Sequence, residues 1–183
     1  MYKLWFQPGS FLHHRDVNPK HLLGYNLILL FFSSLFLGLI MVRMMDIEEI
    51  SKTVTFLVLA TVLVIPFFYI LNFIYTIIVA LICLIFRVEI VLLKAYSIII
   101  SVNSFLFMFS ALLICLQVTF HYPIVIFGSL VGSWIISFMA VRVFYYGLHQ
   151  YVGLNKGFCL FFCGIVAVVA VITNSIGVIS YVS

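Results

Sequence analysis

Cysteines are the residues of this chain whose type could do chemistry most directly. Cys159 and Cys163 are four residues apart, so on a helix they share one face, and such a pair could bind a metal ion or carry lipid groups. No third or fourth metal ligand lies near them in the sequence. We therefore expect small apolar side chains without a disulfide, within or at the edge of hydrophobic segments, at Cys83, Cys115, Cys159 and Cys163.

Histidines near the N-terminus form the second candidate set. His13 and His14 are adjacent, with His21 further on, so their side chains diverge, and Asp16 is the only carboxylate close to them. We expect no metal ion and no cofactor, and the chain offers no base and nucleophile pair, which argues against an enzyme. The composition favours an interfacial segment over residues 1–21 on the cytoplasmic face of a membrane. Its residues at headgroup level would be Trp5, Phe6, Phe11 and Leu12.

Uncharged polar residues inside the apolar segments form the third set, and it includes Asn72, Asn103 and Asn174. They could line a polar pathway through a membrane. Transporters and proton pathways usually carry a buried carboxylate, histidine or basic residue, and none occurs inside these segments. We therefore favour hydrogen bonds between neighbouring helices, worth about 1 kcal/mol each, over a pathway.

The elements that position these residues follow from the composition, since 66% of the residues are hydrophobic and 8% are charged. The surface of a soluble domain needs about 25% charged residues, so a soluble fold is excluded. Long uncharged runs predict an all-α membrane protein, with a single membrane domain over residues 1–183. The five predicted transmembrane helices cover residues 22–42, 54–86, 95–118, 124–144 and 157–182.

The second of these segments is too long for one crossing and too short for two. We interpret it as one tilted helix kinked at Pro66, where Thr61 or a neighbouring helix satisfies the freed carbonyl group near Val62. A re-entrant hairpin at Pro66 is the alternative. A single crossing here gives an odd number of spans, which puts the termini on opposite sides of the membrane.

Basic residues select the orientation, because cytoplasmic loops carry an excess of Lys and Arg. With the N-terminus in the cytoplasm and the C-terminus outside, only Arg43 and Lys52 lie on the outer side. The other seven of the nine basic residues are cytoplasmic: Lys3, Arg15, Lys20, Arg87, Lys94, Arg142 and Lys156. The net charge of +4 is spread over these segments, so a nucleic-acid partner is not expected. The N-terminal residues also lack the pattern of a cleavable signal peptide.

Small residues recur four apart in the fourth span, which lets another helix backbone approach closely. We favour packing within the bundle, and contact with a partner subunit is the alternative. The residues are Gly128, Ser129, Gly132 and Ser133.

Two connectors on the cytoplasmic side form a hypothetical docking surface. One carries charges among aliphatic residues, as interfacial segments do, and the other bends at either of two glycines between aromatic anchors. A plain loop is the alternative for both. The surface comprises Arg87, Glu89, Lys94, Tyr145, Tyr146, Gly147, Leu148, Gly153, Leu154 and Lys156.

The chain resembles the Yip domain family, which comprises Rab-GTPase-interacting proteins of the early secretory pathway and bacterial relatives. The similar motifs are Ala95-Tyr96-Ser97, Tyr145-Tyr146-Gly147-Leu148, Gly153-Leu154-Asn155-Lys156-Gly157, Trp5-Phe6-Gln7-Pro8 and Asn18-Pro19-Lys20. The resemblance implies five spans and a cytoplasmic N-terminus. It departs at Ile98-Ile99-Ile100-Ser101, where family members commonly carry a proline. The long N-terminal region of eukaryotic members is missing, so the bacterial type is the closer match and a direct Rab partner is doubtful.

Function is less well specified than topology. We expect a non-catalytic scaffold or accessory subunit that binds and organises another membrane complex, for example a transport complex. Its partners would be other integral membrane subunits, a second copy of the chain, or lipid. The alternatives are a small transporter or channel component with a neutral polar pathway, and a mitochondrially encoded subunit of a respiratory complex. A bacterial cytoplasmic membrane is the expected location, with an organelle membrane as the alternative.

Overall fold

The computed structural model describes residues 2–13, 17–120 and 122–182, and the side chains of these ranges except Tyr2, His13 and residues 173–182. The protein is 88% helical, and these described residues contain no strand. The all-α prediction is therefore confirmed. In chain order the helices are α1 (Tyr2–Phe6), α2 (Pro8–His13), α3 (Pro19–Met44), α4 (Ile50–Ile85), α5 (Leu92–Thr119), α6 (Pro123–Tyr146), the π-helix η1 (Gly147–Val152) and α7 (Lys156–Val182).

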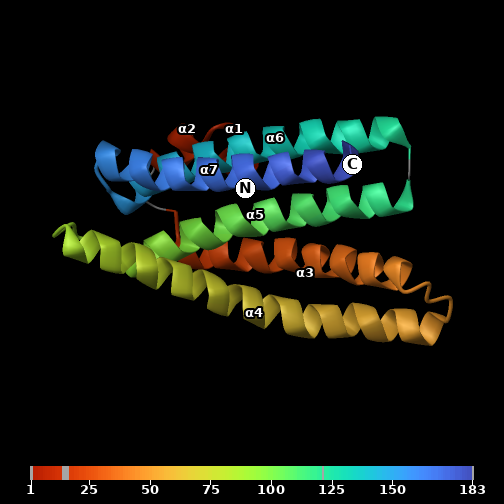
Figure 1. Cartoon of the computed structure of the whole chain (residues 1–183). Coiled ribbons are helices and arrows are strands. Elements are labelled where there is room, and N and C mark those ends of the chain that lie inside the picture. The colour runs from red at the N-terminus through yellow and green to blue at the C-terminus, as the bar shows by residue number, and fades with distance from the viewer. Residues whose placement is uncertain (1, 14–16, 121, 183) are drawn as a thin grey trace.

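Five long helices lie side by side and successive ones run in opposite directions (Figure 1). Helix α3 packs against α4 and α5, α5 also contacts α4 and α6, and α7 packs against α6. Four of them, α3 to α6, are long and apolar enough to cross a membrane, whereas the described apolar part of α7 is shorter. The fold therefore agrees with a multi-pass membrane protein.

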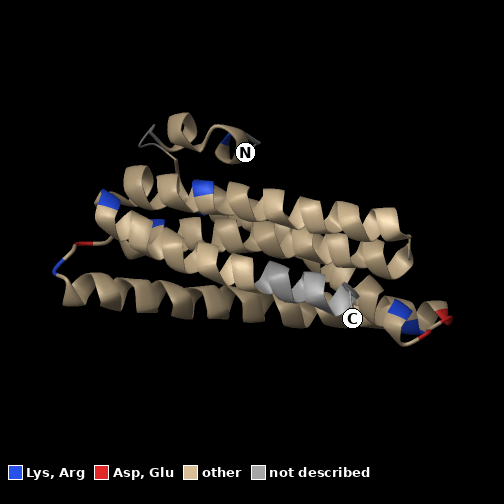
Figure 2. Ribbon diagram, turned by 45° about the horizontal axis from the view of Figure 1, so that its top comes forward, with Lys and Arg blue, Asp and Glu red and all other residues tan. Residues whose placement is uncertain are grey.

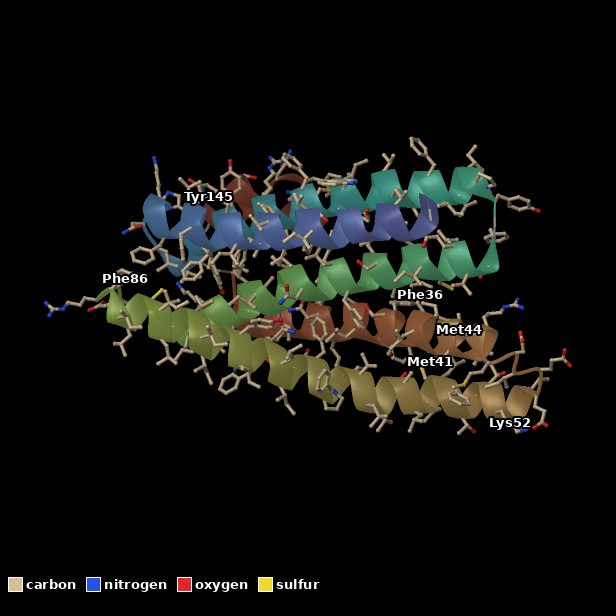
Figure 3. The ribbon with its side chains drawn as sticks, viewed as in Figure 1. Phe36, Met41, Met44, Lys52, Phe86 and Tyr145 are labelled. Atoms are coloured by element: carbon tan, nitrogen blue, oxygen red, sulfur yellow. The ribbon has the colours of Figure 1, made fainter. Side chains whose placement is uncertain are left out.

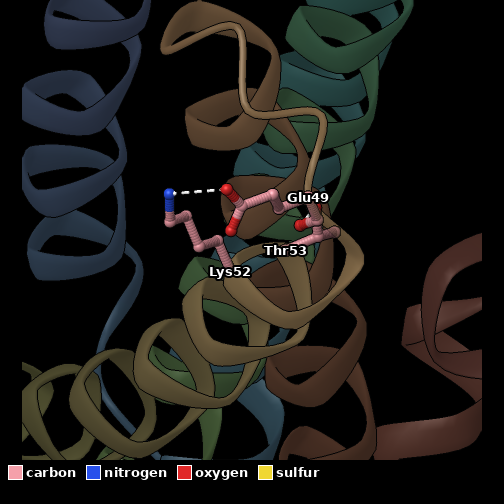
Figure 4. A network of polar contacts seen from close by, with 3 residues as sticks. All are labelled: Glu49, Lys52 and Thr53. Carbon is pink, nitrogen blue, oxygen red and sulfur yellow. Dashed lines mark hydrogen bonds and ion pairs between the residues drawn. The ribbon is translucent and has the colours of Figure 1, made fainter.

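Outside the N-terminal arm, the charged residues lie toward the two ends of the bundle (Figure 2). Because the helices alternate in direction, the starts of α3, α5 and α7 share one end, here called the η1 end. The connection from α3 to α4 lies at the other end, where Lys52 binds Glu49 at 3.0 Å and the Thr53 hydroxyl donates to the Glu49 carbonyl group (Figure 4). Arg43 and Lys52, predicted outside, thus lie at the end opposite to Lys20, Arg87, Lys94 and Lys156, which were predicted in the cytoplasm.

Helix α4 continues through Pro66 without interruption, so the re-entrant hairpin does not form. The Thr61 hydroxyl donates to the carbonyl oxygen of Leu57 at 2.9 Å, one turn earlier. Thr61 therefore does not act on the carbonyl group near Val62, and that part of the prediction is wrong. A threonine on a helix bonds back to residue i−4 when its neighbours leave the hydroxyl free to do so.

The C-terminus of α4 ends in a left-handed turn. Arg87 has φ 57°, its N–H donates to the Leu84 carbonyl oxygen, and the N–H of Val88 donates to that of Cys83. Glycine is the usual residue at this position, because a side chain in the left-handed region costs about 1–2 kcal/mol. The following residues up to Val91 are not helical, so the connector is not an amphipathic helix.

The buried core is concentrated at the η1 end, where helices α1 and α2 (the N-terminal arm) pack against α6 and η1. Leu4 and Leu12 are fully buried, and the ring of Trp5 stacks on that of Phe105 with centroids 3.6 Å apart. The Tyr151 hydroxyl donates to the Val17 carbonyl oxygen at 2.8 Å. Trp5 and Leu12 were predicted at lipid headgroups, but they are covered by protein.

Candidate binding groove

A cavity of about 670 Å³ lies between α4 and α7 and is floored by α5 and α6. Its lining is apolar except for a few uncharged polar side chains and the Tyr75 phenol group. Helix α4 contributes Phe68, Leu71, Asn72, Tyr75, Ile78, Val79 and Ile82, α5 contributes Ile99, Val102, Asn103, Leu106, Phe107 and Ser110, α6 contributes Ser133, Ile136, Ser137 and Phe144, and α7 contributes Phe162, Ile165, Val166, Val169 and Ala170. We call this cavity the groove.

The groove exists because its two walls pack against different neighbours. Helix α4 is held by α3 and α5, whereas α7 is held by α6 and η1, and over the described residues the two walls do not pack on each other along their length. At the η1 end the rings of Phe86 and Phe158 meet edge to face with centroids 5.4 Å apart. This contact joins the walls at one end and leaves the groove between them.

Two predicted asparagines meet in the groove. Asn103 Nδ2 donates to Asn72 Oδ1 at 2.5 Å, and Asn72 Nδ2 donates to the Phe68 carbonyl oxygen at 2.8 Å. The pair joins α4 to α5, the interhelical role that we favoured. The side chain of Asn174 lies outside the described residues.

Three serines line the groove, and two of them, Ser110 and Ser133, lie closest to the turn between α5 and α6. Ser110 on α5 and Ser133 on α6 are each about 15 Å from the turn that joins these helices. In a hydrocarbon layer of about 30 Å that begins at this turn, both hydroxyl groups lie near the middle. Ser133 donates to the Leu130 carbonyl oxygen at 2.7 Å, whereas the exposed Ser110 hydroxyl has no hydrogen-bond partner within the described part of the chain.

The chemistry of the groove is limited by what lines it. No Asp, Glu, Lys, Arg, His or Cys is among the lining residues. Across the described residues, no three His, Cys, Asp or Glu side chains lie close enough together to hold a metal ion. The groove is therefore suited to binding an uncharged, largely apolar partner through shape and a few hydrogen bonds.

No family model, curated protein or solved structure matches this chain.

One wall of the groove, α4, reaches further toward the η1 end than its neighbour α3 does. The Ser34 hydroxyl donates to Thr61 Oγ1 at 3.1 Å, which fixes the level of α3 against α4. From this contact the uncharged part of α3 runs about 18 Å to Leu22, whereas that of α4 runs about 37 Å to Phe86. Helix α4 thus projects about 20 Å beyond the apolar segment of α3.

The projecting part of α4 is buried on one side, at Thr76 and Cys83, but its last turn is apolar and uncovered. Leu84, Ile85 and Phe86 are 70%, 76% and 62% exposed. Figure 3 shows Phe86 at the far end of α4 from Lys52. Helix α4 cannot tilt alone to bring this end into the membrane, because contacts with α3 hold it alongside over several turns.

The four residues of the predicted small-residue motif lie in three different environments. Ser129 is buried and accepts a hydrogen bond from Gln117, and a Cβ atom added to Gly132 would contact Leu113 at ordinary distance. Ser133 faces the groove, and nothing lies within 4 Å of a Cβ atom added to Gly128. Half of the motif thus packs on α5, and half does not.

The predicted docking surface is only partly a surface. Gly147, Leu148 and Leu154 are buried, because α6 continues as the π-helix η1 under the N-terminal arm instead of opening into a loop at Gly147. Of the two glycines expected to bend the chain, only Gly153 has a positive φ, 90°. These three buried residues were therefore assigned wrongly.

The remaining docking residues are accessible to different degrees. Tyr145 and Tyr146 are half-buried, and Lys94 Nζ lies 5.2 Å from the centroid of the Tyr151 ring. The exposed residues are Arg87, Glu89, Gly153 and Lys156.

The thiol and imidazole groups considered first lie apart from the groove lining. Cys159 is buried near the Leu154 carbonyl oxygen, and Cys163 lies 3.9 Å from that of Val141. Cys83 is also buried, and Cys115 is half-buried. The side chain of His13 and all of His14 and Asp16 lie outside the described residues, and His21 is exposed.

One polar cluster was missed by sequence reasoning. Asn26 on α3 is fully buried, donates to Ser101 Oγ at 3.1 Å and accepts from Ser104 Oγ at 3.0 Å. The cluster could have been predicted from the sequence, because Asn26 is an asparagine inside an uncharged segment, as Asn72 is. A close approach of α3 to α4 at Gly38 was signalled by Ser34, since small residues four apart mark helix contacts.

Proposed function

We propose that this protein is a non-catalytic membrane subunit that binds one helix of a partner membrane protein in the groove between α4 and α7. The projecting, exposed end of α4 carries this proposal. A bilayer that fits α3 covers about 30 Å of apolar chain, and the headgroup region adds only about 6 Å on each side. The last turns of α4 would then be exposed to water. Large apolar patches are rarely left exposed to water and usually mark an interaction site.

The groove favours a helix over a lipid as occupant. Ser110 presents a hydroxyl group without a partner in the described structure near the middle of the hydrocarbon layer, where acyl chains have no hydrogen-bonding atoms. A transmembrane helix can carry Ser, Thr, Asn or Gln at that depth. A helix that continues beyond the membrane also covers Ile85 and Phe86, which follow Ile78 and Val79 of the groove lining by seven residues and which lipid tails do not reach.

The same proposal includes the topology. Helix α7 is the fifth span, the N-terminus lies in the cytoplasm, and the η1 end is the cytoplasmic end. The grouping of basic residues at that end supports this orientation through the positive-inside rule. The partner helix would then emerge from the groove on the cytoplasmic side.

Photo-crosslinking at two neighbouring isoleucines tests the proposal. Ile78 lines the groove and Ile77 does not, yet both are on α4 at nearly the same depth and both are exposed. A photoreactive amino acid at position 78 should give a protein adduct of one defined mass in the source membranes, and position 77 should not. Equal labelling at both positions, or adducts of lipid alone at position 78, would contradict the proposal.

Filling the groove with a large side chain provides a second test of the proposal. Ser133→Trp puts a large ring into the groove, whereas Ile135→Trp enlarges an exposed position on α6 that does not line it. The first change should abolish the adduct formed from position 78, and the second should leave it. Both variants must elute as the wild-type protein does in detergent, which shows that they fold.

A small transporter for uncharged solutes is the second candidate function. It is favoured by the cavity that brings Asn72 and Asn103 together at the groove floor. Proteoliposomes that swell faster with the protein than without it in glycerol or urea, and lose this effect on Asn103→Leu, would support it. Unchanged swelling would exclude transport of these solutes.

A further inference from the structure

Arg87 occupies a position that its side chain does not favour. It has φ 57° at the end of α4, in the motif where glycine is the usual residue. The equivalent position after α3 is Asp46, φ 48°, a residue type that visits this region more readily. Strained residues of this kind persist where the side chain has a role, which directs attention to the guanidinium group.

Arg87 and Lys156 flank the same mouth of the groove. The contact between Phe86 and Phe158 joins the end of α4 to the start of α7, and each ring lies within two residues of one of these cations. Both cations are exposed, and neither has an ion-pair partner in the described part of the chain. The nearby Glu89 carboxylate forms no ion pair with them.

Lys94, another cation of the η1 end, is already engaged. Lys94 Nζ lies 5.2 Å from the Tyr151 ring centroid, in a cation–π contact with the core under the N-terminal arm. Arg87 and Lys156 are the basic groups next to the contact of Phe86 with Phe158, where an occupant of the groove would emerge.

We infer that Arg87 and Lys156 bind carboxylate groups on the partner helix, at the point where it leaves the groove beyond the membrane. This inference rests on the proposed function and adds the chemistry of the partner. The helix is apolar and uncharged along the groove and carries Asp or Glu within about two turns of its exit. Charge pairs at an exposed rim select the partner and orient it.

Arg87→Gly tests the inference without endangering the fold, because it relieves the left-handed strain. Its melting temperature in detergent should equal or exceed that of the wild type, whereas the adduct from position 78 should fall on the order of threefold. Arg87→Lys keeps the charge and should retain most of the adduct. Adding Lys156→Gln to Arg87→Gly should lower the adduct further, on the order of tenfold. Lys52→Gln, at the opposite end of the bundle, is the control.

The outcomes separate the two proposals. A wild-type adduct that persists in Arg87→Gly with Lys156→Gln overturns the carboxylate pairing and leaves the groove proposal standing. Equal losses in Arg87→Gly and Arg87→Lys overturn it as well, since shape and not charge would then matter. No protein adduct from position 78 in the wild type overturns the groove proposal and the inference together. The pairing is supported if the adduct from position 78 decreases only in the variants that lose a positive charge. High salt should then decrease the adduct of the wild-type protein in the same way.

Discussion

The Tyr69 hydroxyl donates a hydrogen bond to the carbonyl oxygen of Leu23 at 3.1 Å and so joins the middle of α4 to the first turns of α3. Leu23 lies at the start of α3, but more than a dozen residues of α4 follow Tyr69. The bond therefore marks the level beyond which α4 continues without α3 beside it.

Tyr69→Phe removes this bond and keeps the ring. We expect a loss of about 0.5–1.5 kcal/mol in the free energy of unfolding, the usual net value of one hydrogen bond. Thermal unfolding in detergent measures it. Tyr75→Phe on the same helix is the matched control, because its hydroxyl has no hydrogen bond in the described structure. Equal losses in the two variants would show that the bond to Leu23 is not stabilising.

The Asn26 cluster should behave as a coupled unit. Asn26→Ala and Ser101→Ala each break the 3.1 Å hydrogen bond between α3 and α5. A double-mutant cycle should give a coupling energy of about 0.6–1.7 kcal/mol, the range for such bonds in membrane bundles. Pairing Asn26→Ala with Ser110→Ala, which lies in the groove, should give additive losses. A coupling near zero for the first pair would mean that each side chain finds another partner when the bond is lost.

Two glycines of α3 should respond in opposite directions to alanine. A Cβ atom on Gly38 would lie 2.8 Å from Leu57 Cδ2 and 3.2 Å from Leu57 Cα, so Gly38→Ala must push α4 away. We expect a destabilisation of about 1–3 kcal/mol. Gly24→Ala meets nothing within 4 Å and should stabilise the helix by up to about 1 kcal/mol. Thermal unfolding of both variants measures these changes in stability. If Gly38→Ala left the stability unchanged, α4 would be able to move away from α3 without loss of stability.

Trp5 should hold the N-terminal arm in place. Its ring is 4% exposed and stacks on Phe105, whereas the adjacent Phe6 is 65% exposed. Trp5→Ala should release the arm, so trypsin should cut at Arg15 and Lys20 about tenfold faster or more than in the wild type. Phe6→Ala should leave the rate unchanged. Similar rates in the two variants would mean that the arm is held by other contacts, such as that of Tyr151 with Val17.

Much of the fold could be predicted from the lengths of the uncharged segments alone. The predicted spans coincide with α3 to α7 to within about a turn, because the charged residues that interrupt them also lie at the bundle ends. Continuity of α4 through Pro66 was predicted from the length of its uncharged segment, which is too short for two crossings and a turn. Helices α4 and α5 begin a few residues before the predicted bounds, because each includes a charged residue, Lys52 or Lys94, in its first turn.

The groove and the buried docking residues were harder to predict. Helices that are apolar on every side do not show which face packs, so the meeting of Asn72 with Asn103, or of Asn26 with Ser101, depends on rotations that the pattern leaves open. Leu148 and Leu154 looked like loop residues. They are covered by contacts that include the N-terminal arm, which lies far from them in the sequence.

The order of the helices along the chain has a consequence for biogenesis. One wall of the groove, α4, and most of its floor, α5, leave the ribosome well before the opposite wall, α7. A nascent chain halted before α7 would present an apolar trough without its second side. On the proposed function, capture of a partner helix waits until translation has passed α7, so the partner would join a finished bundle and would not enter the bilayer together with its early helices.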